Sequence, residues 1–208
     1  MNMFKITDEL LRQFFNRCKQ ERPFIVALDG LSGAGKTTLV QKLEQKLHAR
    51  DCKVTIFHID DHIVERQKRY NTDYEEWYEF YHLQWDVEKL RLNLFEGIYR
   101  NIGEITLPFY DKSNDTHSTY SKVIETDSIV LIEGIFLQRK EWRPYYEFVI
   151  YLDCSREKRY ERELNRDTYI GDKQNIVDKY NRRYWPGEDY YLKVENPLGN
   201  ADMIWRSN

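Results

Sequence analysis

The stretch GLSGAGKT at residues 30–37 constrains the fold of this chain more than any other part of the sequence. It lies between the short apolar run FIVAL at residues 24–28 and the segment TTLVQKLEQKLHA, whose leucines recur at helical spacing. Its glycines, lysine and threonine satisfy the pattern GxxxxGK[ST], in which backbone N–H groups converge on phosphate oxygens at a helix N-terminus. The alternative is a glycine-rich turn that merely joins a strand to a helix.

Further apolar runs predict the sheet that would carry this loop. KVTIFHI at residues 53–59 reads as a second strand, so that strand, loop, helix and strand form a βαβ unit. SIVLIEGIF at 128–136 and EFVIYLD at 147–153 are apolar enough for parallel strands buried on both faces. We therefore expect an α/β fold of three layers, α/β/α, around a central parallel sheet, with the second strand next to the loop strand.

The middle of the chain differs from the rest in composition and residue pattern. Residues 62–95 are aromatic and charged with helical spacing, and EITLPFYD and HSTYSKVIE alternate like two strands around a turn near residues 112–115. We interpret residues 62–126 as an insertion that builds one wall of a substrate cleft. With an amphipathic helix within residues 1–22, the 208 residues are expected to form a single domain.

Composition limits the partners and the compartment. The net charge is −3 and no basic stripe is present, so we expect no nucleic-acid partner. Cys18, Cys52 and Cys154 are widely separated, which argues against a zinc site or a disulfide framework and fits a reducing cytoplasm. No segment reads as a secretory signal or a membrane span. Whether the chain forms a homo-oligomer is left open.

The glycine-rich loop predicts an ATP site. Lys36 would reach the β- and γ-phosphates, and the Thr37 hydroxyl would bind Mg²⁺. The residues predicted to contact ATP are Gly30, Leu31, Ser32, Gly33, Ala34, Gly35, Lys36, Thr37 and Thr38.

Other strings narrow the class of nucleotide-binding protein. A regulatory GTPase needs a guanine-reading NKxD, which does not occur. Motor and transporter ATPases carry an apolar strand that ends in Asp or Asp-Glu, whereas SIVLIEG ends in Glu133 and a glycine. These absences favour transfer of a phosphoryl group to a small hydroxyl acceptor. A regulatory module that binds nucleotide without turnover is the alternative outside the enzymes.

Carboxylates at strand ends are candidates for the chemistry. Asp60 and Asp61 follow the second strand, and we expect Asp60 to accept the hydroxyl proton while the other caps the next helix. Glu133 would lie in the ligand crevice at a neighbouring strand end and act on Mg²⁺ or its bound water. A solvated loop position is the alternative for Glu133.

A row of arginines follows the fourth strand. Arg159, Arg162 and Arg166 are spaced by three and four residues, which places them on one helix face. One interpretation is a solvent face of salt bridges with the interleaved glutamates. The other is a lid, residues 155–175, whose arginines neutralise charge on the transferring phosphoryl group.

These motifs together resemble the uridine kinase and phosphoribulokinase family of P-loop kinases, and its uridine kinase-like branch in particular. The similarity runs over roughly residues 23–205. DGLSGAGKTT matches the family's phosphate loop, IDDH its strand-end aspartate, PFYD and a following His its substrate hairpin, and IVLIEGI its "VVIFEGI" strand. RYERELNRD follows the lid pattern "RxxRRxxRD" through Asp167, but has Glu163 in place of the second adjacent arginine.

The resemblance implies a P-loop kinase fold with a substrate-side insertion and a helical lid. It also implies transfer of the ATP γ-phosphate, with Mg²⁺, to a primary hydroxyl such as the ribose 5′-OH of uridine or cytidine. Asp60 falls on the family's base position, and the lid alignment favours catalytic roles for its arginines. Tyr110 and His117 fall on hairpin positions that contact the pyrimidine.

The departures from the family lie where specificity is decided. Ile63 replaces an aromatic residue, and Lys112 replaces the hairpin aromatic that would stack on a base. Phe80 replaces the sugar-binding aspartate, and the adjacent Glu79 is the candidate substitute. The lid-closing "RGRD" is reduced to IGD at 170–172. Nicotinamide riboside, pantothenate or a sugar are therefore alternative acceptors.

Overall fold

The structure is a computed structural model that describes residues 3–17, 21–166 and 170–206. A five-stranded sheet in the order β2-β5-β1-β6-β7 runs through its centre, and every strand pair in it is parallel. This confirms the predicted α/β architecture. The strands of this sheet are β1 (Phe24–Gly30), β2 (Val54–His58), β5 (Ile129–Gly134), β6 (Phe148–Asp153) and β7 (Met203–Arg206).

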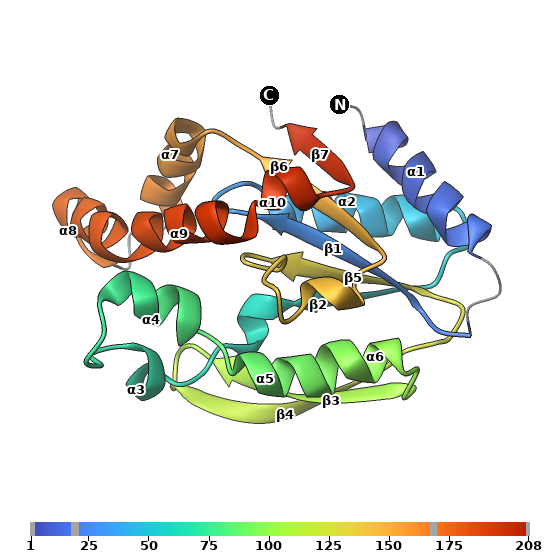
Figure 1. Cartoon of the computed structure of the whole chain (residues 1–208), viewed down its shortest axis with the longest axis horizontal. Helices are drawn as coiled ribbons and strands as arrows, with labels where there is room; N and C mark the ends of the chain where they lie inside the picture. Colours follow the sequence, from blue (N-terminus) through green and yellow to red (C-terminus); the bar gives the residue numbers. More distant parts are fainter. Residues whose placement is uncertain (1–2, 18–20, 167–169, 207–208) are drawn as a thin grey trace.

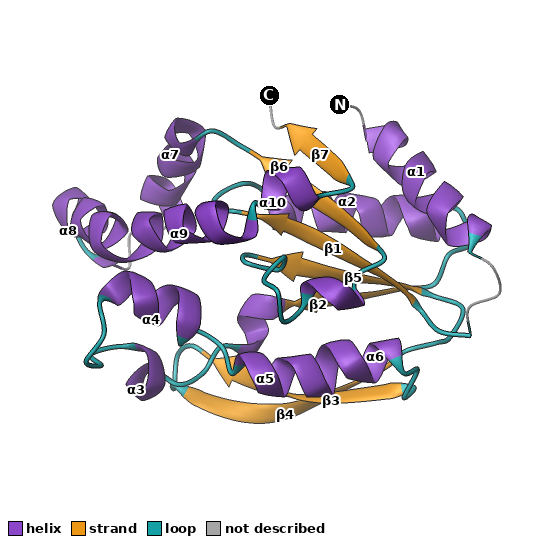
Figure 2. Ribbon diagram, viewed as in Figure 1, coloured by secondary structure: helices purple, strands orange, loops and turns teal. Residues whose placement is uncertain are grey.

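Helices lie on both faces of the sheet and at the end where the strands finish (Figure 1, Figure 2). Short 3₁₀ turns at Ile59–His62 and Arg143–Tyr145 and π-helical turns at Arg91–Glu96 and Tyr180–Tyr184 connect or continue them. The helices are α1 (Met3–Asn16), α2 (Lys36–His48), α3 (Arg66–Arg69), α4 (Glu76–His82), α5 (Val87–Leu90), α6 (Gly97–Tyr99), α7 (Arg156–Arg166), α8 (Lys173–Lys179), α9 (Trp185–Glu195) and α10 (Pro197–Asn200).

The central strand β1 divides the interior into two hydrophobic cores. All its residues are buried, and successive side chains point to opposite faces of the sheet. Val26 and Leu28 pack with apolar residues of α1 and α2, whereas Ile25 and Ala27 pack with the aromatic residues that follow β2 and β5. A strand buried on both faces explains why FIVAL carries no polar alternation.

The strand order differs from the prediction in one respect. β2 pairs with β5, and β5 lies between β2 and the loop strand β1. The buried pattern identifies parallel strands but does not rank equally apolar neighbours, so the order was not readable. As a result Glu133 pairs in register with both Leu28 and His58, at the centre of the carboxyl edge. The short strand β7, which is only partly buried, was not predicted.

The predicted hairpin is present. β3 (Glu104–Asp111) and β4 (Thr116–Val123) form an antiparallel pair in which Tyr110 lies opposite His117. The hairpin lies beneath α5 and α6 in Figure 1, on the opposite side of the sheet from α1 and α2. Its buried side chains Ile105 and Leu107 join the same core as Ile25. The division of residues 62–126 into an insertion stays a prediction.

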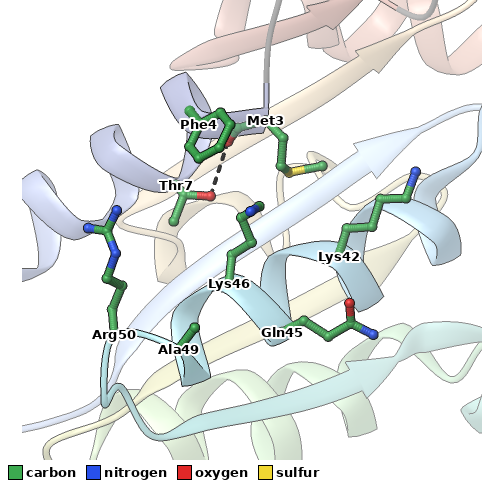
Figure 3. Close-up of a pocket in the computed structure, with 8 residues that line it drawn as sticks. All are labelled: Met3, Phe4, Thr7, Lys42, Gln45, Lys46, Ala49 and Arg50. Carbon is green, nitrogen blue, oxygen red and sulfur yellow. Dashed lines mark hydrogen bonds between the residues drawn. The ribbon is translucent and has the colours of Figure 1, made fainter.

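The helices α1 and α2 enclose a cavity of about 480 Å³ (Figure 3). Lys42, Lys46 and Arg50 line it together with Phe4, over whose ring the Lys46 ammonium lies at 4.6 Å. The three basic residues occupy the C-terminal half of α2 and the turn beyond it, and Phe4 belongs to α1, whereas the phosphate loop adjoins the N-terminus of α2. The cavity is therefore separate from the predicted ATP site.

Two remaining sequence expectations concern cysteines and membranes. Cys52 and Cys154 are free thiols, and Cys18 lies outside the described residues. Across the three described stretches of chain, no helix is both long and apolar enough to cross a membrane.

Candidate active site

The glycine-rich loop connects β1 to α2 in the predicted manner. Gly33 and Gly35 have φ angles of 71° and 95°, a left-handed region in which a side chain would be strained. The 13-residue helix α2 begins at Lys36, and no described side chain caps its N-terminus. Its first N–H groups and the positive end of its dipole therefore suit a phosphate group. The remaining predicted ATP contacts, Gly30, Leu31, Ser32, Ala34, Thr37 and Thr38, lie in this loop and in the first turn of α2.

Lys36 carries the positive charge of the loop. Its Nζ donates to the Leu31 carbonyl at 3.0 Å, which folds the side chain over the loop. Burial lowers the pKa of the ammonium, and the carboxylates of Glu133 and Asp60 oppose that change. The structure thus brings Lys36, Glu133 and Asp60 within electrostatic reach of one another, although they are far apart in the sequence.

Thr37 and Glu133 offer adjacent oxygen donors. The Thr37 hydroxyl donates to Glu133 Oε1 at 3.3 Å, and His58 Nδ1 lies 2.7 Å from the same oxygen. Burial alone would raise the pKa of Glu133, but the His58 hydrogen bond and the Lys36 charge outweigh it and lower that pKa. A hydroxyl beside an ionised carboxylate fits Mg²⁺, which prefers oxygen ligands and keeps several waters. In the described part of the chain no group of three or more His, Cys, Asp or Glu side chains is arranged to hold a metal ion.

Asp60 and Asp61 lie in the 3₁₀ turn directly after β2. The Trp85 indole donates to the Ile59 carbonyl at 2.9 Å, and His62 Nδ1 contacts the Pro108 carbonyl at 2.7 Å, so both sides of the turn are held. Asp60 is exposed to solvent, and the charges of Lys36 and Glu133 lie near it. Partial loss of hydration raises its pKa, and Lys36 opposes that change. Such an aspartate is suited to accept a proton.

The expectation that one of the paired aspartates caps the next helix is wrong. The N-cap residues of the 3₁₀ turn and of α3 are His58 and Glu65, and neither makes a side-chain cap hydrogen bond. The chain turns immediately after β2, so both aspartates fall inside the turn rather than before a helix. Asp61 is half-buried beside Asp60.

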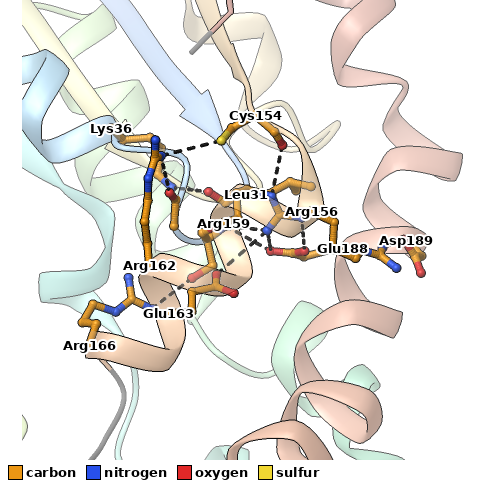
Figure 4. Close-up of polar contacts among 12 residues, drawn as sticks. Leu31, Lys36, Cys154, Arg156, Arg159, Arg162, Glu163, Arg166, Glu188 and Asp189 are labelled. Atoms are coloured by element: carbon orange, nitrogen blue, oxygen red, sulfur yellow. Dashed lines mark hydrogen bonds and ion pairs between the residues drawn. The ribbon is translucent and has the colours of Figure 1, made fainter. Parts of the chain in front are cut away.

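The arginines of α7 face the phosphate loop (Figure 4). Arg162 Nη1 donates to the Gly33 carbonyl at 2.9 Å, and Arg166 Nη2 donates to the Ser32 hydroxyl at 3.3 Å. Arg159 Nη1 donates to the Ser32 carbonyl at 2.9 Å. These contacts bring the three arginines onto the phosphate loop, and the assignment of residues 155–175 as a lid stays a prediction. Asp167, the last residue of the lid pattern, lies outside the described residues.

Arg159 differs from the other two arginines. It is 2% exposed, and its guanidinium makes two 3.0 Å hydrogen bonds to the carboxylate of Glu188, a residue of α9 that is 1% exposed. Arg162 and Arg166 are exposed. The three lid arginines are thus one buried guanidinium with a carboxylate partner and two at the surface of the loop.

On the acceptor side, the polar atoms of the predicted pyrimidine contacts engage the chain itself. The Tyr110 hydroxyl accepts from Arg69 Nη2 at 3.1 Å and donates to Asp115 Oδ1 at 2.7 Å. His117 has Nδ1 2.9 Å from Glu65 and Nε2 2.9 Å from the Ile63 carbonyl. The two residues lie side by side, with ring centroids 5.5 Å apart.

Glu79 and Phe80 are both buried. Glu79 Oε1 accepts from the backbone N–H and the hydroxyl of Thr72, and its Oε2 accepts from Arg183 at 2.8 Å. Arg183 is itself fully buried. Phe80 packs edge-on against Phe136, with centroids 5.1 Å apart. In this structure the carboxylate of Glu79 therefore holds α4 to the π-helical turn before α9.

Several residues of the site were not found from the sequence. His58 contacts Glu133 because β2 and β5 are neighbours, and Glu188 reaches Ser32 and Arg159 from 156 and 29 residues away. Arg69 likewise pairs with the distant Tyr110, and Arg183 pairs with the distant Glu79. For His58 the signal was available, since it precedes Asp60 at a strand end, but its partner depends on strand order.

A buried parallel sheet, a phosphate loop at a helix N-terminus and an aspartate-bearing turn at the end of another strand of that sheet are the features of a P-loop kinase fold. The chain belongs to the phosphoribulokinase / uridine kinase family, whose sequence profile matches residues 25–207.

Individual proteins of this kind are similar over most of the chain. A uridine kinase from Staphylococcus haemolyticus is 29% identical over 86% of this chain and 90% of its own length. A uridine kinase from Macrococcus caseolyticus is 28% identical over 85% of this chain and 80% of its own length. A solved structure of a possible uridine kinase from Bacillus stearothermophilus superimposes with a TM-score of 0.81 and 41% identity, covering 99% of this chain and 100% of that one.

Proposed function

We propose that this chain is an ATP-dependent kinase that transfers the γ-phosphate of ATP to a hydroxyl group of a small molecule. The observation that carries the proposal is the convergence of Lys36, Thr37, Asp60 and Glu133 at the carboxyl edge of one sheet. A P-loop kinase needs positive charge on the phosphates, metal ligands and an acceptor-side base, and these four residues provide each of them.

Asp60 and Lys36 have opposite tasks in this proposal. Asp60 accepts the proton of the acceptor hydroxyl as that oxygen bonds to the γ-phosphorus, and its raised pKa brings it closer to the working pH of a base. The bond from the γ-phosphorus to the bridging oxygen breaks, and ADP leaves. Lys36 neutralises charge that develops on the phosphate oxygens, where a fixed cation in a site of low hydration acts strongly.

Thr37 and Glu133 hold the metal in this proposal, and His58 keeps Glu133 ionised and oriented. Mg²⁺ bound to Thr37 and Glu133 would supply charge neutralisation on the phosphates. Arg162 and Arg166 exclude water by covering the loop and can turn from the Gly33 carbonyl and the Ser32 hydroxyl toward the phosphates. Arg159, already paired with Glu188, acts on the loop backbone.

The first acceptor to consider is uridine or cytidine. The named relatives support it, as does the position of Tyr110 and His117 on adjacent strands of the hairpin. The two rings offer an apolar wall to a base, even though their polar atoms already have partners within the chain.

A second candidate is an acidic alcohol, of which pantothenate is an example. Lys112 at the hairpin turn is close enough to Asp60 to oppose the rise in that residue's pKa, so a cation lies within electrostatic reach of the base. The groups that would read a nucleoside, the Glu79 carboxylate and the polar atoms of Tyr110 and His117, are engaged elsewhere. A carboxylate-bearing acceptor would use the cation and would not need those groups.

Release of ADP by the purified protein with Mg–ATP tests the proposal. The acceptors are uridine, cytidine, nicotinamide riboside, pantothenate, simple sugars and small hydroxy acids, each compared with a reaction lacking acceptor. Acceptor-dependent ADP release supports kinase activity, and the ranking of kcat/KM decides between the nucleoside and the acidic alcohol. ATP binding without release of ADP for any acceptor would instead indicate a regulatory module.

A further inference from the structure

Two buried carboxylates lie against the phosphate loop and share one buried guanidinium. Glu163 of α7 is 0% exposed and Glu188 of α9 is 1% exposed, and both contact Arg159 (Figure 4). Buried carboxylates ordinarily require a compensating charge or several hydrogen bonds. Here the Arg159 guanidinium lies within 4 Å of both carboxylates, at the position where a polyphosphate would bind.

Glu188 and its partner Arg159 together hold both backbone groups of Ser32 in the loop. Its Oε1 accepts from the Ser32 N–H at 3.0 Å, while the bidentate partner Arg159 donates to the Ser32 carbonyl at 2.9 Å. A bidentate guanidinium–carboxylate pair is among the stronger and more directional contacts in proteins. The peptide groups on either side of Ser32 are therefore fixed by side chains from two distant helices.

Glu163 lies one helical turn beyond Arg159 and packs onto the loop. A Cβ atom built on Gly33 would come within 3.0 Å of Glu163 Oε1 and 2.9 Å of the Arg159 carbonyl, so the helix and the loop are in close contact. Within the described part of the chain, neither carboxylate oxygen of Glu163 meets hydrogen-bond geometry with a partner, although the Ser32 side chain lies near it. Glu163 Oε1 is 3.9 Å from the Arg159 guanidinium, which already has Glu188 as its bidentate partner.

We propose that Glu163 and Glu188 are positioning residues of the ATP site: Glu188 fixes Ser32 through Arg159, and Glu163, in its protonated form, seals the lid helix against Gly33. The inference rests on the proposed function in assuming that ATP binds at this loop. Ionised Glu163 would add a negative charge beside the phosphates with no cation of its own, because Arg159 is already paired with Glu188, and it would repel both ATP and Glu188.

The charges around Glu163 support this protonation state. Burial, reinforced by Glu188 of α9, raises the pKa of Glu163 to about 7. Arg159 and Arg166 of α7 and the nearby Ser32 side chain of the loop oppose the rise. Burial also raises the pKa of Glu188, against the opposing charges of Arg159 and of Lys36 in the loop. The pKa of Glu163 therefore lies where this group changes charge near neutral pH.

The first experiment measures ATP affinity by titration calorimetry with Mg²⁺ and no acceptor, from pH 5.5 to 8.5, in wild type and Glu163→Gln. The two proteins should bind alike at the acid end, and the variant should bind about tenfold more tightly at the alkaline end, because it cannot acquire the charge. Comparing the two proteins cancels the titration of ATP itself. Glu161→Gln, which changes an exposed glutamate of the same helix, should follow wild type.

The second experiment tests coupling between the acids. In Glu188→Gln, Arg159 is left with Glu163 as its carboxylate partner, so the pH midpoint of the affinity change should fall by about 1 unit or more. A residue that only packs the loop would not move that midpoint. An unmoved midpoint in a folded variant would overturn the sharing of Arg159 between the two acids.

Thermal unfolding provides a readout that does not depend on ATP. A carboxyl group whose pKa is raised on folding stabilises the native state below its ordinary value, and this stability is lost as pH rises from about 4.5 through about 7. The Tm of Glu163→Gln should therefore rise relative to wild type over that range. Coincident Tm differences at all pH values would overturn the buried proton at Glu163.

The outcomes separate the two proposals. ATP binding with parallel pH curves for wild type and Glu163→Gln overturns this inference and leaves the kinase proposal standing. Failure of wild type to bind ATP at any pH overturns both the proposed function and the positioning roles.

Discussion

The phosphate-loop side and the acceptor side of this molecule use their charged residues in opposite ways. Around the loop, Lys36, Asp60 and Glu133 come within electrostatic reach of one another, and Asp60 is exposed. On the acceptor side, Glu79 is fully engaged in a buried ion pair with Arg183. The hydroxyl of Tyr110 likewise has both a donor and an acceptor within the chain.

This difference separates chemistry from specificity. Phosphoryl transfer depends on groups that must remain open to ATP, metal and a hydroxyl, and these groups match the family pattern. Recognition of the acceptor depends on which polar groups remain available after the chain has satisfied its own hydrogen bonds. The family therefore predicts the reaction more firmly than it predicts the molecule that is phosphorylated.

The largest expected effect is on the phosphate-loop side. Lys36→Ala should abolish phosphoryl transfer, a loss beyond the roughly 10²–10³ caused by removing one neutral donor, because a full charge is lost. The fold should survive, as judged by circular dichroism and Tm. Lys42→Ala, on the exposed side of the same helix, is the matched control and should keep wild-type kcat. Near wild-type activity of Lys36→Ala would contradict the claim that the phosphate-loop side carries the chemistry.

Asp60→Asn should lower kcat by roughly 10²–10⁴, the usual contribution of a positioned acid–base group, with little change in ATP affinity. The neighbouring Asp61→Asn is the control and should have the smaller effect. Steady-state kinetics at saturating Mg–ATP measure both. A larger loss for Asp61→Asn would show that the base was assigned one residue too early.

Glu79 tests whether the acceptor side is closed as described. Glu79→Ala leaves Arg183 buried without its carboxylate and should destabilise the fold by about 3–5 kcal/mol in urea unfolding. Glu76→Gln, which breaks the exposed pair with Arg182 on the same helix, should cost less than about 1 kcal/mol. A stable Glu79→Ala protein with a raised KM for the acceptor would mean that Glu79 faces the acceptor after all.

The smallest expected effect concerns the charge at the hairpin turn. Lys112→Phe should lower kcat/KM for an acidic acceptor by about tenfold, the value of one exposed charge contact at short range, and raise it for uridine. Neutral sugars measured with the same variant provide the control. Equal changes for acidic and neutral acceptors would show that Lys112 does not select charge.

The fold was readable from the sequence where the signal was local. FIVAL followed by GLSGAGKT specifies a buried strand, a loop with left-handed glycines and a helix start, all within neighbouring residues. The hairpin was readable because alternation and turn residues are also local. Strand order was not, because the choice of neighbour depends on the whole sheet.

Only the site residues that belong to short sequence motifs could be predicted from the sequence. Lys36, Thr37, Asp60 and Glu133 each belong to a short string with a chemical reason for its spacing. The partners Glu188 and Arg183 are carried by a C-terminal segment without such a string, and burial alone reveals them. Glu163 looked like a solvent-face residue of a charged helix, yet it is fully buried against Gly33 because α7 packs onto the loop.

The most direct test of the central claim follows the γ-phosphate itself. ATP labelled at the γ-position is incubated with wild type, Asp60→Asn and the acceptor that ranks first in kcat/KM, under single-turnover conditions. The account predicts that the label appears on the acceptor hydroxyl and that Asp60→Asn slows this transfer by at least about 10²-fold. Label found only as inorganic phosphate, at equal rates in the two proteins, would contradict it.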